Sequence, residues 1–329
     1  RIRPGPRPGQ RVTPPGDVCA RRGKAGVEYQ PLIPIANARA CRAWAAALVA
    51  ACAALVPHDV LAQTARTHID VTYATVDGKP LGLDLYLPAG VPSPALVVWV
   101  HGGAWRSGTK AKPPMLFVEG GMAMASLDFR QSGEARFPAN VHDIKAAIRF
   151  LRAQARQYGY RTDRIAIAGS SSGGHLAALV GVSNGQKELE GTVGAHLDQS
   201  SDVAAIVDYF GASNLTTILA QSTPHGLSVR RPALELLLGA LPDVEPRLAQ
   251  LASPVAHVDR GDPPLLIFHG DQDPQMPINQ SHELQGAYEK AGLDVHFDVV
   301  HGAAHGGDAF FSPDRKARAL AFLRRTIGQ

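Results

Sequence analysis

The sequence predicts an α/β fold, in which a mainly parallel central sheet is flanked by helices and carries a small lid or cap insertion. Short apolar runs alternate with segments of helical period, which is the pattern of a sheet covered on both faces. The run at 95–100 is apolar throughout, as a strand buried on both faces requires. Polar, glycine-rich motifs follow four separate runs, and open α/β sheets place their sites at the carboxyl ends of such strands.

The first part of the chain has the composition of a leader. Residues 1–35 are rich in proline, arginine and glycine without an apolar period, so we expect a disordered or non-native upstream segment. Residues 36–62 resemble a secretory signal peptide, with Arg39 and Arg42 before an apolar core and small residues before Gln63. The core is too short for a comfortable membrane span. We therefore predict an exported protein, periplasmic or secreted, with no stable membrane span in its mature form.

The positions of the cysteines and the distribution of charge bear on disulfides, on thiol catalysis and on nucleic-acid binding. The three cysteines, Cys19, Cys41 and Cys52, all precede residues 63–329, which excludes disulfides and catalytic thiols there. A lipoprotein-like cleavage at Cys52 is a minor alternative to cleavage near residue 62. The formal net charge is +4, but acidic residues slightly outnumber basic ones after position 62, so charge gives no argument for nucleic-acid binding. Residues 63–329 have the size of a single catalytic domain, and the oligomeric state is left open.

Eight strands are expected in this domain. The runs at 69–73 and 83–87 alternate apolar and polar residues, which suits antiparallel edge strands. The run at 95–100 is expected to be a central strand. The remaining strands are predicted at 122–127, 165–168, 204–209, 264–268 and 295–300.

Helices are expected between these strands, each with an apolar stripe that faces the sheet. The segment 212–258 differs, because it is longer than a simple crossover and carries its own apolar patch. We expect a lid beside the site there, although a crossover that only packs on the sheet is also compatible with the sequence. The helical stripes are Ile144, Ala147, Ile148 and Leu151; Leu284, Ala287, Tyr288 and Ala291; and Ala317, Leu320, Leu323 and Ile327; the patch is Leu234, Leu236, Leu237 and Leu238.

The motif Gly169-Ser170-Ser171-Ser172-Gly173 stands between a predicted strand and a predicted helix. A serine hydroxyl is a weak nucleophile, so it must project from a tight turn where a histidine can take its proton. Ser183 lies in a second Gly-x-Ser-x-Gly sequence, but that one follows a helical run and leads into a polar loop. Ser171 is therefore the expected nucleophile.

Three other motifs follow strands. In the loop that begins at His101, backbone amides of Gly103 or Ala104, with that of Ser172, are expected to bind a developing oxyanion, and His101 to brace the loop. Trp105 is expected either to line the substrate pocket or to pack. Two carboxylates, Asp273 and Asp271, compete for the acid position, and Asp273 is favoured. His305 is favoured as general base over His301, which gives the chain order Ser171, Asp273, His305.

These motifs resemble those of α/β-hydrolases of the esterase/lipase group, near the bacterial feruloyl-esterase-like carboxylesterases. The resemblance covers residues 67–327. Ala104 stands where a third loop glycine is usual and Ser172 where many relatives carry alanine, but neither change removes a catalytic group. The motifs that carry the resemblance are His101-Gly102-Gly103-Ala104-Trp105, Asp128-Phe129-Arg130, Phe137-Pro138-Ala139, Ser171-Ser172-Gly173-Gly174-His175, Asp208-Tyr209-Phe210-Gly211, His269 to Pro277 and Gly302 to Gly306.

The resemblance implies a serine carboxylic-ester hydrolase that works through an acyl-enzyme, with Ser171, His305 and Asp273 as its triad. Feruloyl, acetyl and short-acyl esters and polyester fragments all remain possible substrates. We expect a small-molecule ester to bind near Trp105 and His175, and we expect neither a cofactor nor a bound metal.

Two other function classes remain open. A metal-dependent hydrolase could use His269, Asp271, Asp273, His301 and His305, although no His-Glu-x-x-His sequence is present. The second is a non-catalytic binding protein with a hydrolase fold. An incomplete triad would indicate such a protein, whereas the triad in this sequence is complete. Inhibition by a serine-directed phosphonate rather than by a chelator would separate the first of these from a serine esterase.

Overall fold

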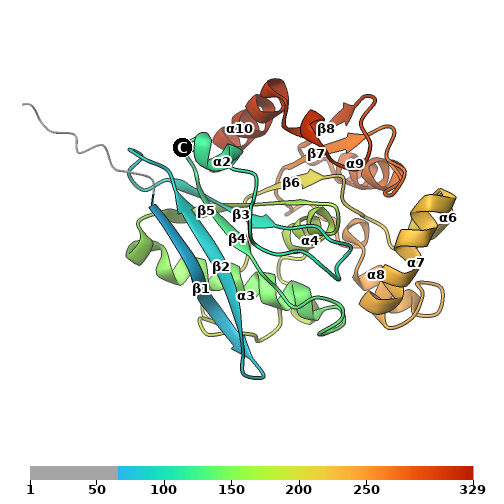
Figure 1. Cartoon of the computed structure of the whole chain (residues 1–329), viewed down its shortest axis with the longest axis horizontal. Coiled ribbons are helices and arrows are strands. Elements are labelled where there is room, and N and C mark those ends of the chain that lie inside the picture. Colours follow the sequence, from blue (N-terminus) through green and yellow to red (C-terminus); the bar gives the residue numbers. More distant parts are fainter. Residues whose placement is uncertain (1–65, 329) are drawn as a thin grey trace, which may run out of the picture. The chain divides into compact units, whose positions relative to one another are not determined.

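An eight-stranded sheet forms the centre of the computed structural model, which describes residues 66–328 (Figure 1). The strand order is β1-β2-β4-β3-β5-β6-β7-β8, and the strands from β3 to β8 are parallel to their neighbours. The mainly parallel sheet is therefore confirmed, whereas the predicted upstream segment and signal peptide lie outside the described residues. The strands are β1 (Arg66–Val76), β2 (Lys79–Leu87), β3 (Ala95–Val100), β4 (Ala123–Leu127), β5 (Arg161–Ser170), β6 (Ala205–Tyr209), β7 (Leu265–Gly270) and β8 (Val295–Val300).

The first two strands are antiparallel, as predicted, but only β1 is an edge strand. β2 pairs with β1 on one side and with β4 on the other, so the prediction of two edge strands was wrong for the run at 83–87. Leu83 and Leu85 are fully buried, and Asp84 is only 4% exposed. The alternation of apolar and polar residues in β2 therefore does not indicate an exposed face. Its polar residue, Asp84, is buried and forms an ion pair with Lys110.

Helices cover both faces of the sheet. Successive side chains of β3 point to opposite faces, so Val98 joins the core beneath one helical layer and Trp99 the core beneath the other. Figure 1 shows α2 and α10 on one side of the sheet and α3 on the other. The first layer contains α3 (Ala139–Tyr158), α4 (Ser172–Gly181) and α9 (Asn279–Ala291), and the second contains α2 (Leu116–Glu119) and α10 (Pro313–Ile327).

The helical stripes were mostly located correctly. Ile144, Ile148 and Leu151 are fully buried in α3, and Leu284 and Tyr288 are fully buried in α9. In α10 Leu323 and Ile327 of the expected stripe are buried and Leu320 is partly buried, whereas Ala317 is exposed. The buried residues of α10 are Ala319, Phe322, Leu323, Thr326 and Ile327.

The segment 212–258 folds as a group of short helices between β6 and β7. Leu234 and Leu237 are fully buried against the α3 layer, and Leu238 is 3% exposed, whereas Leu236 is 44% exposed and does not belong to the patch. We call residues 212–258 the inserted helices. They are α6 (Ile218–Gln221), α7 (Pro224–Leu238), α8 (Pro246–Leu251) and the short 3-10 helix η1 (Pro254–Ala256).

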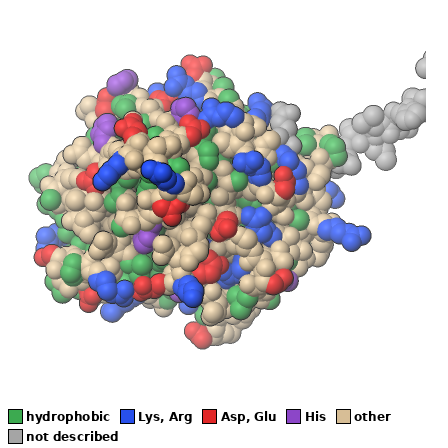
Figure 2. All heavy atoms as spheres, turned by 180° about the vertical axis from the view of Figure 1, so that it is seen from behind, with side chains coloured by type: hydrophobic (Ala, Val, Ile, Leu, Met, Phe, Trp, Pro, Cys, Tyr) green, Lys and Arg blue, Asp and Glu red, His purple; other side chains and the backbone are tan. Residues whose placement is uncertain are grey.

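Two short helices complete the fold, α5 (Lys187–Glu190) and the 3-10 helix η2 (Asp308–Phe311). Within residues 66–328, no helix is both long enough and apolar enough to cross a membrane. On the face drawn in Figure 2, acidic and basic side chains are interspersed rather than gathered into a field of one sign.

Candidate active site

Ser171 stands at the sharp turn between β5 and α4. Its backbone has φ 54° and ψ −122°, outside the regions that a non-glycine residue ordinarily adopts. The turn is held by its own amide, which donates to the carbonyl of Tyr209 over 2.8 Å. A Cβ at Gly169 would collide with the backbone of Gly173, and a Cβ at Gly173 with the carbonyl oxygen of Val100. The two glycines therefore permit the close approach that projects the serine.

Three side chains from separate loops form one hydrogen-bonded chain. The hydroxyl oxygen of Ser171 lies 2.8 Å from Nε2 of His305, and Nδ1 of His305 lies 2.6 Å from a carboxylate oxygen of Asp273. The serine follows β5, the aspartate follows β7 and the histidine follows β8. The carboxyl ends of these parallel strands lie at one edge of the sheet, so residues that are far apart in sequence meet there.

The side chain of Asp273 is fully buried, and both oxygens of its carboxylate are hydrogen-bonded. One oxygen accepts from the amides of Gln275 and Met276, each over 2.8 Å, while the other faces His305. Burial acts to raise the pKa of Asp273, but hydrogen bonds from His269 and His305 outweigh it and hold the pKa well below its usual value. The carboxylate is therefore ionised at neutral pH and can stabilise a cationic imidazole.

His269 supports the aspartate rather than taking part in the chain. Its Nε2 lies 3.0 Å from the carbonyl of Met276 and 3.4 Å from Asp273, and its Nδ1 lies 2.6 Å from the hydroxyl of Ser281. Since a carbonyl and a carboxylate only accept, the proton belongs on Nε2, and Nδ1 accepts from the serine. His269 therefore donates to the carbonyl of Met276, and the same N–H faces the second carboxylate oxygen of Asp273.

The competing candidates lie outside this chain. Asp271 pairs instead with His301 over 2.8 Å, and the His301 side chain is 83% exposed. Ser183 is buried at the end of α4, where its hydroxyl donates to the carbonyl of Val180. Of the two candidates for each role, the structure therefore brings together the favoured ones, which are Ser171, Asp273 and His305.

The loop after β3 has an unusual backbone. Gly103, Ala104 and Trp105 all have positive φ, at 125°, 52° and 60°. The carbonyl of Gly103 accepts from the amides of Arg106 and Ser107, each over 3.1 Å, so this carbonyl points back into its own loop. The amide of Ser172 is in the first turn of α4 and has no acceptor within the helix. These are the backbone positions that the sequence suggested for binding an oxyanion.

His101 braces this loop, as expected. Its ring stacks on Phe129 with centroids 4.6 Å apart, and its Nδ1 lies 2.7 Å from the carbonyl of Gly102. Burial lowers its pKa, so the ring is neutral at neutral pH.

Trp105 and His175 are buried against each other. Trp105 is 1% exposed, and its indole N–H donates to Nδ1 of His175 over 2.9 Å. His175 is fully buried, and its Nε2 donates over 2.7 Å to the carbonyl of Ala252 in the inserted helices. Burial lowers the pKa of His175 to about 4, which matches a neutral ring with one donor and one acceptor. Trp105 therefore packs, which is one of the two expectations for it, and contact of Trp105 or His175 with substrate stays a prediction.

Arg230, on α7, was missed by the sequence reasoning. It is 1% exposed, its guanidinium lies 5.9 Å from the centre of the Trp105 ring, and its Nε donates to the carbonyl of Gln275. Its Nη1 is buried without a hydrogen-bond partner in the described part of the chain. Burial lowers its pKa to about 10, and Arg106 lowers it further while Asp273 opposes the shift. No motif marks this arginine, because only the fold brings α7 against the two loops.

Asp208, in β6, is a second buried charge that the motifs did not explain. One carboxylate oxygen accepts from the amide of Gly211 over 2.8 Å, and the other is buried without a partner among residues 66–328. Burial raises its pKa to about 7, against the opposing effects of His269 and the Gly211 amide. A Cβ at Gly174 would collide with this carboxylate, so Asp208 packs directly beneath α4.

The metal-site residues do not converge. His301 pairs with Asp271, while His305 and His269 both face Asp273. Within residues 66–328, no three histidine, cysteine, aspartate or glutamate side chains are placed to hold one metal ion. This arrangement gives the metal-dependent alternative no support.

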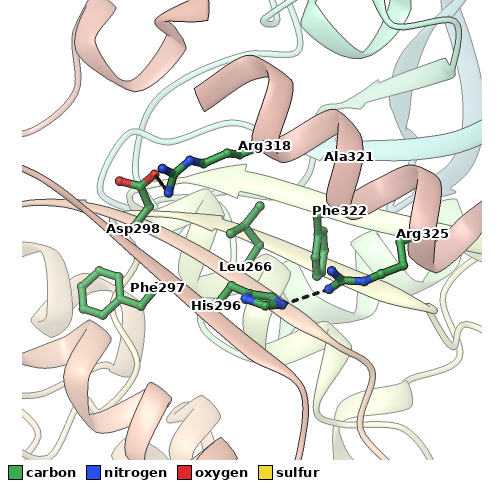
Figure 3. A pocket seen from close by; sticks show the side chains of 8 residues that line it. All are labelled: Leu266, His296, Phe297, Asp298, Arg318, Ala321, Phe322 and Arg325. Carbon is green, nitrogen blue, oxygen red and sulfur yellow. Dashed lines mark hydrogen bonds and ion pairs between the residues drawn. The ribbon is translucent and has the colours of Figure 1, made fainter. Parts of the chain in front are cut away.

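Two cavities differ in their relation to this site. One, of about 390 Å³, has Ser170 in its wall, next to the nucleophile. The other, of about 300 Å³, lies between β8 and α10, and none of the predicted site residues lines it (Figure 3). In the second cavity Arg318 pairs with Asp298, and Arg325 with His296 and Asp294. Ser170, which precedes the nucleophile in the chain, lines only the first cavity, and neither cavity is lined by Ser171, Asp273 or His305.

Comparison with known proteins gives concordant results. The model of the BD-FAE family matches residues 83–288, which is more than half of the chain. The esterase LipQ of Mycobacterium tuberculosis is 33% identical over 251 residues, which cover 73% of this chain and 57% of LipQ. The chain therefore spans little more than half the length of this curated relative.

Two solved structures are similar over most of the described residues. A truncated carbohydrate esterase from gut microbiota is 32% identical with a TM-score of 0.74, and the match covers 80% of this chain and 97% of the other. Esterase 2 of Thermogutta terrifontis, solved phosphonylated by sarin, is 27% identical with a TM-score of 0.66, over 80% and 95% of the two chains. With its mainly parallel sheet and these similarities, the chain belongs to the BD-FAE family of α/β-hydrolase esterases.

Proposed function

We propose that this protein is a serine carboxylic-ester hydrolase in which Ser171, His305 and Asp273 form the catalytic triad. The observation that carries the proposal is the hydrogen-bonded chain from the serine hydroxyl through the imidazole to the buried carboxylate, with steps of 2.8 and 2.6 Å. Such a chain lets the histidine act as a base towards the serine while the aspartate fixes its tautomer.

The first half-reaction forms an acyl-enzyme. The Ser171 oxygen attacks the ester carbonyl carbon, and its proton passes to Nε2 of His305. The carbonyl π electrons move to oxygen and give a tetrahedral oxyanion. When that intermediate collapses, the carbon–oxygen bond to the alcohol breaks, and the alcohol oxygen takes the proton from His305.

The second half-reaction repeats these steps with water. His305 takes a proton from the water molecule, whose oxygen attacks the acyl carbon. Collapse of the second oxyanion releases the carboxylic acid and returns the proton to Ser171. Asp273 remains ionised throughout, since its pKa is held low and it needs only to stabilise the imidazolium.

Backbone amides are proposed to stabilise both oxyanions. The amide of Ser172 begins α4, and the loop from Gly103 to Trp105 turns its backbone with three positive φ values. Removing one oxyanion donor typically costs about 10²- to 10³-fold in rate. A strained backbone of this kind is kept only where surrounding contacts hold it, and such positions concentrate at functional sites.

We propose small and aryl esters as substrates, among them acetylated or feruloylated carbohydrates. The support is the similarity to a carbohydrate esterase. Short-acyl esters and polyester fragments have the same reacting group.

The inserted helices are proposed to act as a fixed cap. The hydroxyl of Thr223 donates to the carbonyl of Pro274 over 2.8 Å, and the amide of Phe137 donates to the carbonyl of Leu237 over 2.9 Å. Together with the contacts of Arg230 and Ala252 described above, these bonds attach the cap to several loops around the site. A cap held in this way selects substrates by shape rather than by opening and closing.

The experiment compares wild-type protein, Ser171→Ala and the matched control Ser183→Ala on p-nitrophenyl esters of graded acyl length and on methyl ferulate. We expect kcat to fall about 10⁶-fold in Ser171→Ala, as for removal of other triad serines, and to change little in Ser183→Ala. A fluorophosphonate should label wild-type protein and Ser183→Ala but not Ser171→Ala. Equal activity in Ser171→Ala and wild type would disprove the mechanism.

Two further outcomes would point to the other function classes. Loss of activity on adding a chelator, with no effect of the phosphonate, would indicate a metal-dependent hydrolase. Ligand binding that survives in Ser171→Ala, without turnover of any ester by the wild type, would indicate a binding protein.

A further inference from the structure

Two backbone amides in the loop after β7 hold the carboxylate of Asp273. We call residues 273–276 the acid loop. One carboxylate oxygen accepts from the amides of Gln275 and Met276, each over 2.8 Å, and the other oxygen faces Nδ1 of His305 over 2.6 Å. The direction in which the carboxylate faces the imidazole therefore depends on where these two amides lie.

The inserted helices hold the same two peptide groups from their opposite side. The carbonyl of Pro274 and the amide of Gln275 belong to one peptide group, and that carbonyl accepts from the hydroxyl of Thr223 over 2.8 Å. The carbonyl of Gln275 and the amide of Met276 belong to the next, and that carbonyl accepts from Nε of Arg230 over 3.2 Å. The C=O and N–H of a trans peptide group lie in one plane and point in opposite directions. A bond that fixes each carbonyl therefore also fixes the amide that binds the carboxylate.

Both donors belong to one face of α7. Thr223 is the N-cap of this helix and accepts from the amide of Gly226 over 3.0 Å. Arg230 follows Gly226 by four residues, and this spacing places all three on the same side of the helix. A Cβ at Gly226 would lie 3.2 Å from the carbonyl oxygens of both Pro274 and Gln275, closer than side chains usually pack. The helix therefore lies directly on the acid loop.

Arg230 reaches the acid loop through a carbonyl and not through the carboxylate itself. Its Nε donates to Gln275, and its Nη1 has no hydrogen-bond partner in the described part of the chain. Burial lowers the pKa of Arg230 to about 10, while the nearby charge of Asp273 acts to raise it. The two opposite charges therefore attract each other, while both carboxylate oxygens keep their bonds to the two amides and to His305.

We propose that Thr223 and Arg230 are positioning residues, which act through the acid loop to keep the Asp273 carboxylate directed at His305. This inference rests on the proposed serine esterase function and adds to it a role for α7. The helix supports the catalytic acid from outside, and neither residue needs to contact the ester in order to affect its hydrolysis.

The test removes one support at a time. Arg230→Met keeps most of the side-chain volume and removes the Nε donor, and Thr223→Val keeps the shape and removes the hydroxyl. Thr223→Ser retains the hydroxyl, and the matched control Arg231→Met changes the next residue of α7, whose side chain is exposed. For each variant, kcat and KM for p-nitrophenyl acetate are measured together with the midpoint of unfolding by urea.

We expect kcat to fall at least about tenfold in Arg230→Met, which loses a bond from a charged donor, and about three- to tenfold in Thr223→Val, which loses a bond from a neutral one. KM should change by less than about twofold in both, since an interaction that serves only the transition state affects kcat. Thr223→Ser and Arg231→Met should keep the kcat of wild type. In Arg230→Met the unfolding midpoint should not fall, so that loss of kcat is separated from loss of folding.

A double-mutant cycle shows whether Arg230 acts through the acid. In the background of Asp273→Asn, adding Arg230→Met should lower kcat by less than about twofold, because the interaction that it supports is already lost. A residue that contacts the ester, or one that only stabilises the fold, would cost the same factor in both backgrounds.

Several results would overturn the proposal. They are a kcat in Arg230→Met within about threefold of wild type, an equal loss in Arg231→Met, a loss that appears in KM alone, or full additivity with Asp273→Asn. These results leave the esterase function intact, provided that wild type hydrolyses the ester and Ser171→Ala does not. Absence of turnover by the wild type would instead count against the esterase function itself.

Discussion

Replacing Asp273 by asparagine tests the proposed chain at its buried end. The oxygen that accepts from Gln275 and Met276 can remain in place, so the new amide nitrogen would face His305 and His269. An amide N–H cannot accept from Nδ1 of His305. The imidazole must then take the other tautomer, with its proton on Nε2, and cannot remove a proton from Ser171, 2.8 Å away.

We expect kcat to fall about 10⁴-fold in Asp273→Asn, which corresponds to about 5.5 kcal/mol of transition-state stabilisation. The assay is p-nitrophenyl acetate hydrolysis at pH 7–8, with the unfolding midpoint measured to show that the variant folds. The matched control is Asp271→Asn, in the neighbouring exposed pair with His301, where we expect less than about a threefold change. A tenfold or smaller loss in Asp273→Asn, or an equal loss in Asp271→Asn, would refute the assignment of the acid.

Three further predictions concern buried groups near the site. In Trp105→Phe, Nδ1 of His175 is left buried without its donor, so the free energy of unfolding should fall by about 1–3 kcal/mol. We also expect kcat to fall by a larger factor than KM changes. A denaturant titration that shows full wild-type stability would contradict this. The pKa of Asp208 is raised to about 7 from 3.8, so the folded state holds a proton that the unfolded chain releases, and stability should fall, by on the order of 4 kcal/mol, as pH rises from about 4 to 7. Asp208→Asn should remove this contribution, so stability should fall less steeply with pH than in wild type; urea titrations of both proteins across this range would show whether the slopes differ. Finally, Arg230→Met removes a buried guanidinium whose Nη1 has no partner among residues 66–328, so the free energy of unfolding should stay within about 1 kcal/mol of wild type or rise, and a loss above 3 kcal/mol in thermal or chemical unfolding would show that its charge is compensated.

The sequence was sufficient for the parts of the site that local patterns determine. Ser171 is marked by glycines whose absence of a side chain is required where β5 turns into α4. Asp273 and His305 follow apolar runs that are long enough to be recognised as strands, and parallel strands bring their carboxyl ends together. The order of motifs along the chain therefore already predicted which side chains meet.

Other features depended on tertiary packing and could not be predicted in this way. The helical period of α10 identified Leu323 and Ile327 correctly but not the start of the buried face, since Ala317 and Ala319 are chemically identical and only Ala319 is buried. The sequence left Trp105 open between lining the substrate pocket and packing, because the partner of its indole N–H, His175, is 70 residues away. Arg230 gave no local signal, because its neighbours come from the loops after β3 and β7.

The order of the strands also bears on biosynthesis. The serine and the histidine are 134 residues apart, and the histidine follows β8, which leaves the ribosome after the other seven strands of this sheet and is the outermost strand on its side. The serine turn can form once β5 and α4 have paired with their neighbours, but its base arrives only when β8 has docked on β7. Closing so long a loop costs conformational entropy, which contacts already formed in the native sheet must offset. The nascent chain is therefore expected to carry an inert serine, and hydrolytic activity to begin only when the whole sheet has been completed.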